Sequence, residues 1–218
     1  MLGIVVALKK EADSFLSSST IIKEYDIGEK KIFEGKFSGY DFALIISGIG
    51  KVSAGIATQI IIDRYSPSYI INFGSAGGTE DLFTKTIYLI EKACQYDFDI
   101  TAIDDVPIGF IQEYGCVYFN TYTNGLNFLP KKNLASGDSF VGTKEKVDII
   151  KSLQCSIFDM EGCAVAQTSK TNGIPVIILK GVSDVFGSGS NSEQFLANLK
   201  EVSDSFPKIL KQVFEKIL

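Results

Sequence analysis

Carboxylates are the strongest candidates for acid–base chemistry in this sequence. The chain of 218 residues contains no histidine, so mechanisms that need an imidazole base and the usual zinc sites are excluded or badly weakened. Three carboxylates stand beside structural breaks: Glu11 at the start of an expected helix, Glu161 where a short strand passes into a helix, and Asp184 after an apolar strand. Each also fits an ordinary structural use, as a helix-terminal charge or a cap.

A glycine-rich segment at residues 47–51, Ser-Gly-Ile-Gly-Lys, follows a strand and opens a helix. A dinucleotide-binding motif would need glycine at position 53, where Ser53 stands. A phosphate-binding P-loop would need Gly at 45 and Ser or Thr at 52, where Ile45 and Val52 stand. The spacing therefore favours a tight turn whose backbone N–H groups lie near a ligand over a phosphate cradle.

A second glycine cluster, Gly-Ser-Ala-Gly-Gly at residues 74–78, follows an apolar strand expected over 69–73. Such a cluster can be a simple turn, or it can let a ligand approach the backbone closely. The pattern alone leaves both interpretations open.

Composition restricts the class of ligand. The net charge is −5, and nucleic-acid binding depends on clustered Lys and Arg, so we expect a small-molecule ligand and no nucleic acid. Arginine occurs only at Arg64, which argues against a dedicated phosphate site.

No apolar run reaches the ~18 residues of a membrane span. The four cysteines form no C-x-x-C pair, and the first residues lack the features of a secretory signal, so we expect reduced thiols in a cytosolic protein.

The elements that must position these residues alternate between strands and helices. Residues 95–134 are the least periodic part and are expected to form strands with long loops. The alternation predicts one domain over residues 1–218, a three-layer α/β/α fold with a central mixed sheet, and ligands at the carboxyl ends of its strands. We expect strands at 3–8, 32–37, 41–47, 69–73, 87–90, 157–160 and 176–182, and helices at 9–16, 51–65, 147–153, 161–171 and 193–218, the last kinked at Pro207.

Taken together, the order of these motifs resembles the 5′-methylthioadenosine/S-adenosylhomocysteine nucleosidases of the purine nucleoside phosphorylase superfamily. The resemblance covers nearly the whole chain and implies the nucleoside phosphorylase-like fold. The matching segments are residues 3–11 (GIVVALKKE), 47–51 (SGIGK), 71–78 (INFGSAGG), 135–141 (ASGDSFV), 158–161 (FDME) and 182–184 (VSD).

The resemblance implies a role for each carboxylate. Glu11 would activate the attacking water, and Glu161 would accept hydrogen bonds from the ribose hydroxyls, with Met160 packed beneath the sugar. Asp184, oriented by Ser183, would donate a proton or a strong hydrogen bond to adenine N7 and accept a hydrogen bond from the 6-amino group. Such a division of labour suits a reaction that builds positive charge on the ribose and expels a base. Further pocket positions implied by the family are Phe140 stacking on the purine, Val141 reading its edge through the backbone, and Leu8, Ile49, Ser75, Ala76 and Gly77.

The sequence departs from the family pattern at several positions. Lys180 takes the place of an arginine in an Arg-x-x-Ser-Asp pattern, which keeps the charge but loses the planar fork. Acidic Asp104 and Asp105 stand where an aromatic residue is expected, and Ser192 replaces a pocket phenylalanine. These positions bear on the nucleophile and on the 5′ pocket.

The sequence thus predicts an N-glycosidic hydrolase that takes an adenine nucleoside and water, needs no metal or organic cofactor, and forms a homodimer whose neighbour helps close the 5′ pocket. Two alternatives stay open. One is a phosphorylase of the same fold, against which the scarcity of arginine argues. The other is a purine-binding protein without turnover, against which the three carboxylates argue.

Overall fold

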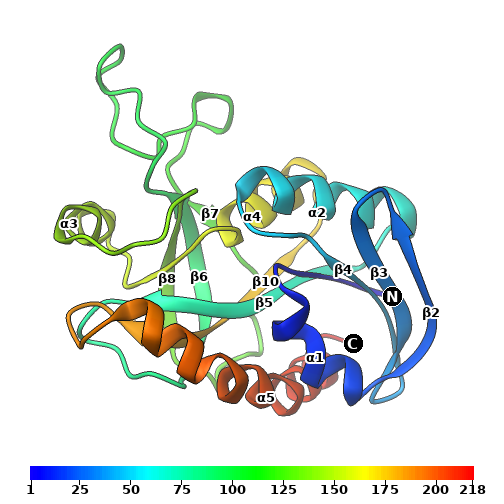
Figure 1. The fold of residues 1–218 in the computed structure, drawn as a ribbon. Helices are drawn as coiled ribbons and strands as arrows, with labels where there is room; N and C mark the ends of the chain where they lie inside the picture. The colour runs from blue at the N-terminus through cyan, green and yellow to red at the C-terminus, as the bar shows by residue number, and fades with distance from the viewer.

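The protein is built around one ten-stranded mixed sheet with helices on both faces (Figure 1). The computed structural model describes residues 1–218 except for the side chain of Asn191. The strands are β1 (Leu2–Val6), β2 (Thr20–Ile27), β3 (Lys30–Phe37), β4 (Tyr40–Ile46), β5 (Tyr69–Gly78), β6 (Ile87–Gln95), β7 (Phe119–Asn120), β8 (Lys131–Ser136), β9 (Ile157–Asp159) and β10 (Val176–Val185). The helices are α1 (Lys9–Ser17), α2 (Lys51–Tyr65), η1 (Gln112–Tyr114), α3 (Lys144–Ser152), α4 (Gly162–Thr171) and α5 (Asn191–Ile217).

The expected three layers are present. Strands β1 and β10 are buried along their whole length. The apolar sequence of β1 predicts this for a parallel strand covered on both faces, whereas β10 also buries Lys180, Ser183 and Asp184. Helices α2 and α4 pack on one face of the sheet, and α1 and α5 pack on the other (Figure 1). The apolar side chains of the sheet are thus divided between these two cores and a third, smaller cluster in which Cys94, Ala135 and Phe158 pack with α3.

Five strands close into a ring. The order β10-β6-β8-β9-β5 is completed by a direct pairing of β10 with β5. Strand β5 also pairs with β1 in parallel and with β9 in antiparallel register, so it joins the ring to the flatter part of the sheet. This closure brings the ends of β5, β9 and β10 to one place, close to the start of α4.

The structure corrects several expected elements. The sequence reading missed β2, a largely exposed strand whose pattern lacks a buried face. The glycine cluster at 74–78 is the second half of β5, not a turn that ends it. A Cβ on Gly77 would lie 2.1 Å from the Phe158 ring, so here glycine permits close approach of a neighbouring strand. Pro207 lies inside α5 and does not end the helix, and the kink expected there stays a prediction.

Long irregular segments occupy much of residues 96–130, as expected. Part of this range extends away from the sheet above α3 and β8 (Figure 1), whereas Leu126 is fully buried in the core beside α1 and α5. Only η1 and β7 interrupt them. Among the described residues, no helix has the length and apolar character needed to cross a membrane.

Candidate active site

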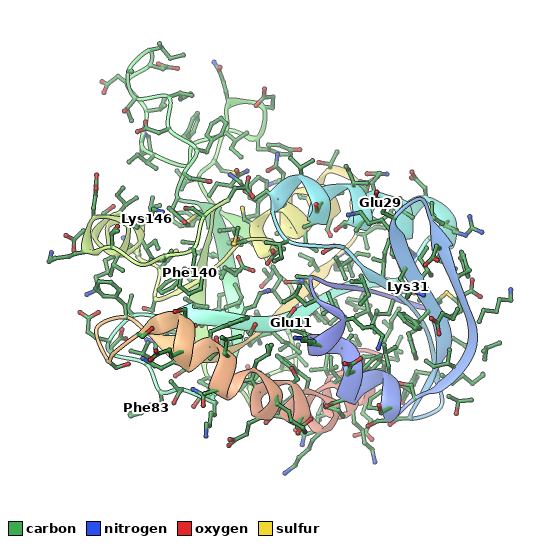
Figure 2. All side chains as sticks on the ribbon, in the orientation of Figure 1. Glu11, Glu29, Lys31, Phe83, Phe140 and Lys146 are labelled. Carbon is green, nitrogen blue, oxygen red and sulfur yellow. The ribbon has the colours of Figure 1, made fainter. Side chains whose placement is uncertain are left out.

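A cavity of about 220 Å³ opens where β1, β5, β9 and β10 end. The residues to which the resemblance gave a catalytic or substrate-binding role all lie in its wall, whereas Lys180, Asp104, Asp105 and Ser192 do not. Figure 2 shows two of them on different elements, Glu11 at the start of α1 and Phe140 in the segment between β8 and α3. The lining residues are Ala7, Leu8, Glu11, Ile49, Ser75, Ala76, Gly77, Ser139, Phe140, Val141, Phe158, Asp159, Met160, Glu161, Ser183, Asp184 and Phe195.

Glu11 is held rigidly although it lies in the first turn of a helix. Its Oε2 accepts a hydrogen bond from the backbone N–H of Leu8 at 3.1 Å. Its Oε1 accepts two more from Ser75, from the backbone N–H at 2.7 Å and the hydroxyl at 2.5 Å. A Cβ on Gly74 would come within 2.9 Å of Oε1, so the glycine gives the carboxylate room against β5. The side chain is only 4% exposed, which rules out the solvated helix charge that the sequence also allowed.

Glu161 reaches across the cavity to the start of α2. Its Oε1 accepts a hydrogen bond from the backbone N–H of Gly50 at 2.9 Å. Burial raises the pKa of Glu161 from 4.5 to about 7, and the negative charge of Asp159 adds to the rise, while Lys180 and the Gly50 N–H oppose it. The free energy of ionising this carboxyl is therefore set by its neighbours.

Asp159 takes the structural role that the sequence allowed for Glu161. Its Oδ2 accepts a hydrogen bond from the N–H of Gly162 at the start of α4, at 2.8 Å, and its Oδ1 accepts one from the hydroxyl of Ser136 at 2.5 Å. Lys180 Nζ lies 2.8 Å from Asp159 Oδ2, and both side chains are at most 3% exposed. Burial lowers the pKa of Lys180, but Asp159, Glu161 and Glu11 together outweigh burial and raise it.

A β-bulge presents the end of β10 to the cavity. Val182 pairs with Ala76 and Asp184 pairs with Gly77, so Ser183 is an extra residue in the ladder. Such a bulge changes the direction in which neighbouring side chains point. The hydroxyl of Ser183 donates to Asp184 Oδ1 at 2.8 Å, and Asp184 is 2% exposed. The carboxylate is thus buried and oriented at the cavity wall.

The opposite wall is the segment between β8 and α3. Its side chains differ in exposure: Phe140 is 51% exposed and Val141 is buried at 3%. The hydroxyl of Tyr96 donates to the carbonyl of Ser139 at 2.9 Å. Lys146 donates to the hydroxyl of Ser139 at 3.0 Å and to the backbone carbonyl of Phe140 at 3.4 Å. An aromatic side chain and the backbone of Val141 therefore line the same cavity as Asp184.

Several lining residues escaped the sequence analysis: Ala7, Ser139, Phe158, Asp159 and Phe195. Ala7 and Ser139 adjoin residues that were identified, and Asp159 could have been found as a second carboxylate beside Glu161. Phe195 carried no local signal. It projects from α5, three residues after Ser192, where the sequence suggested that an aromatic had been lost.

The position of the arginine and the arrangement of potential metal-binding side chains both bear on the choice of ligand. The only arginine, Arg64, lies with its guanidinium 5.2 Å from the centre of the Tyr25 ring, outside the cavity wall. Within the described part of the chain, no cluster of three or more His, Cys, Asp or Glu side chains has the arrangement of a metal site.

The fold and the cavity together define a nucleoside phosphorylase-like protein, and the comparisons with known proteins agree. Residues 1–215 match the family model described as Phosphorylase superfamily. A relative from Buchnera aphidicola, a 5′-methylthioadenosine/S-adenosylhomocysteine nucleosidase, is 35% identical and is covered over 98% of its length by 100% of this chain. The chain therefore belongs to the 5′-methylthioadenosine/S-adenosylhomocysteine nucleosidase family, the N-glycosidic hydrolases of the phosphorylase superfamily.

Two solved structures are similar over nearly the whole chain. The nucleosidase of Colwellia psychrerythraea in complex with adenine has a TM-score of 0.87 and 25% identity, with 99% of this chain and 95% of that chain covered. The futalosine hydrolase of Helicobacter pylori has a TM-score of 0.89 and 26% identity, with 99% and 97% covered.

Proposed function

We propose that the protein hydrolyses the N-glycosidic bond of 5′-methylthioadenosine, S-adenosylhomocysteine or a related adenine nucleoside and releases adenine. The observation that carries the proposal is the meeting of Glu11, Glu161 and Asp184 in one buried cavity. Cleavage of this bond needs a base for water, an acceptor beside the sugar and an acid at the leaving base. The three carboxylates supply these three groups, and the chain has no histidine to compete for the roles.

Glu11 is the proposed general base. Three donated hydrogen bonds fix its orientation, so a water beside it would be held in place against the anomeric carbon. As the bond from that carbon to N9 breaks, the water oxygen bonds to the carbon and its proton passes to Glu11. The electron pair of the broken bond goes to the departing base.

Asp184 is the proposed acid for the leaving base, because it is buried and oriented by Ser183. Its proton or a strong hydrogen bond at adenine N7 would let the base depart neutral. Phe140 would stack on the purine, and the backbone of Val141 would read the edge of the ring. A second acceptor oxygen on Asp184 would receive the 6-amino group.

Glu161 is the proposed partner of the ribose hydroxyls, with Met160 beneath the sugar. In its ionised form it would also stabilise positive charge that develops on the ribose. Leu8, Ile49 and the backbone of β5 at Ser75, Ala76 and Gly77 would complete the pocket. Phe195 stands in the same wall and is proposed to contact the 5′ substituent.

Water is the proposed nucleophile, in preference to phosphate. Phosphorylases need a dianion beside the anomeric carbon, and guanidinium groups match phosphate oxygens best. Arg64 lies against Tyr25, and Lys180 is already paired with Asp159. Asp159, Glu161 and Glu11 surround that single ammonium, so a phosphate dianion would meet an excess of negative charge.

A substrate panel tests the proposal. We expect adenine release from methylthioadenosine and adenosylhomocysteine at full rate in phosphate-free buffer, with free sugar as the second product. Inosine tests the requirement for the adenine base, and adenosine and 5′-deoxyadenosine test the requirement at the 5′ position. Futalosine tests whether the chain shares the activity named for the similar Helicobacter pylori hydrolase. A sugar 1-phosphate as main product, or a rate that saturates with phosphate, would favour the phosphorylase. Adenine binding without turnover of any nucleoside would favour the binding protein.

The proposal includes a homodimer. Ile49, Val52 and Ile56 are 55%, 73% and 50% exposed. Val52 and Ile56 are four residues apart and share one side of α2, and Ile49 lies just before the helix begins. Ile49 also lines the cavity, so a second copy on this surface would help close the 5′ side of the pocket. Light scattering on the purified protein and on the Val52→Glu variant tests it, and a monomeric wild-type protein would refute it.

A cytosolic location is part of the proposal as well. The four cysteines are free, and three of them are buried. The sulfurs of Cys94 and Cys155 lie 3.6 Å apart without a bond between them. Unpaired thiols at such a distance suit a reducing compartment, and the location is tested by fractionation of the source cells.

A further inference from the structure

The start of α2 holds two carboxylates at once. The backbone N–H of Gly50 donates to Glu161 Oε1 at 2.9 Å, and the next N–H, of Lys51, donates to Asp138 Oδ1 at 2.7 Å. Both N–H groups belong to the first turn, where no intrahelical carbonyl is available and the helix dipole favours negative charge. One turn of backbone therefore connects the carboxylate assigned to the ribose with a carboxylate outside the cavity.

Asp138 precedes the wall that faces the purine. It is followed directly by Ser139, Phe140 and Val141, which all line the cavity. Its own N–H donates to Asp97 Oδ2 at 2.8 Å. The side chain of Lys51 donates to Asp97 Oδ1 at 2.5 Å and lies 3.9 Å from Asp138 Oδ2. The Asp138 carboxylate is thus the direct contact between this wall and the start of α2.

We propose that Asp138 is a positioning residue that fixes the purine wall relative to the ribose carboxylate Glu161, through the consecutive N–H groups of Lys51 and Gly50. The inference rests on the proposed function and deepens it. Base and sugar are bound by segments far apart in the sequence, and a reaction at the bond between them depends on their relative placement. Small displacements of this kind reduce rates even when each half of the substrate is still bound.

The base wall has other supports that do not involve the Asp138 side chain. Tyr96 holds Ser139 through its carbonyl and hydroxyl, and Asp97 holds the N–H of residue 138. An alanine at position 138 leaves these contacts in place. Removal of the carboxylate should therefore disturb the connection to the ribose side more than the binding of adenine itself.

The main test is Asp138→Ala, a change at a side chain that is 48% exposed and outside the packed core. We expect kcat/KM for methylthioadenosine to fall about tenfold, the loss typical of one charge-assisted hydrogen bond. The inhibition constant of free adenine should change less than about threefold, because adenine has no ribose and does not depend on the position of Glu161. Asp138→Asn keeps an oxygen acceptor for the Lys51 N–H and should recover most of the activity.

Asp148→Ala is the matched control. Asp148 is also an exposed aspartate in an ion pair, with Lys144 on α3 at 2.6 Å, and it does not line the cavity. Its removal should leave kcat/KM and adenine inhibition unchanged. Hydrogen exchange supplies a readout without substrate: the Lys51 amide should exchange faster in Asp138→Ala than in the wild type or the Asp148→Ala variant.

The outcomes separate the two hypotheses. A wild-type kcat/KM in Asp138→Ala overturns the positioning role. Equal losses in kcat/KM and in adenine affinity overturn it too, because Asp138 would then support only the purine wall. If the wild-type protein releases no adenine, the proposed function fails. Hydrogen exchange still tests the positioning role in that case, and unchanged exchange of the Lys51 amide in Asp138→Ala would overturn it.

Discussion

The stability of the protein should depend on pH mainly through Glu161. The pKa of this carboxyl rises from 4.5 to about 7 on folding, chiefly because it is buried and because Asp159 lies near it. The folded state therefore holds a proton that the unfolded chain has already released over this range. The stability that comes from this bound proton is present in full below pH 4.5, the pKa of Glu161 in the unfolded chain. It is lost as the pH rises through about 7, the pKa in the folded protein.

The size of the effect follows from the two pKa values. At about 1.36 kcal/mol per pKa unit, the folded protein should lose about 2.5 kcal/mol of unfolding free energy between pH 5 and pH 8. For a chain of this length, each kcal/mol shifts the midpoint of thermal unfolding by about 2–4 °C. The chain has no histidine, so few other groups titrate in this window.

Glu161→Gln removes the titration and keeps the shape. The amide oxygen can still accept the hydrogen bond from Gly50, so the variant should match the wild type near pH 5 and exceed its midpoint by about 5–10 °C at pH 8. The same variant should lose kcat/KM, because a neutral amide cannot stabilise positive charge on the ribose.

The assay is thermal unfolding of both proteins without ligand, in buffers of equal ionic strength from pH 5 to pH 8. If the unfolding midpoints of the wild type and Glu161→Gln differ by the same amount at pH 5 and at pH 8, Glu161 does not change its ionisation in the folded protein over this range. A destabilised variant at pH 8 would show that its charge is favourable in the fold, against the reasoning from burial.

The remaining predictions concern the other buried charged groups. Glu11→Gln should lower kcat by about 100-fold or more with substrate binding largely kept, because the base is lost and the shape is not; steady-state kinetics with near-normal kcat would refute the role. Asp184→Asn should slow adenine nucleosides more than ribosides with activated nitrophenyl leaving groups, which need no acid; equal losses on both substrates would exclude Asp184 as the acid. Lys180→Met should cost about 3–5 kcal/mol in urea unfolding, because it leaves Asp159 buried without its partner; a loss below about 1 kcal/mol would refute the importance of this buried ion pair for stability.

The sequence by itself determined the class of fold and the set of groups available for chemistry. Short apolar runs such as residues 176–179 are typical of buried strands between helices. The absence of histidine pointed to carboxylates for acid–base work, and the single arginine argued against a phosphate site. The order of the motifs led to the residues that the resemblance implies for the site, and these residues lie in the wall of one cavity. Ser75, Ala76 and Gly77 nevertheless lie inside β5 and not at a break between elements.

Tertiary structure decided what each charged group contacts. Glu161 and Asp159 are two residues apart and equally acidic in sequence, yet one reaches Gly50 across the cavity and the other caps α4 and pairs with Lys180. The closure of β10 onto β5, with a bulge at Ser183, also depends on pairings between distant strands. Phe195 enters the cavity wall from α5, and Asp138 meets Lys51 across 87 positions of sequence.

The physical reason is that local patterns report burial and backbone preference, which act over one or two turns. Hydrogen bonds, ion pairs and the pKa of a buried carboxyl depend on the few atoms that folding places within about 3–4 Å. Those atoms come from segments whose meeting is fixed by the topology of the sheet. The residue types of this site could therefore be read from the sequence, but the pKa of Glu161 and the pairing of Lys180 with Asp159 could not.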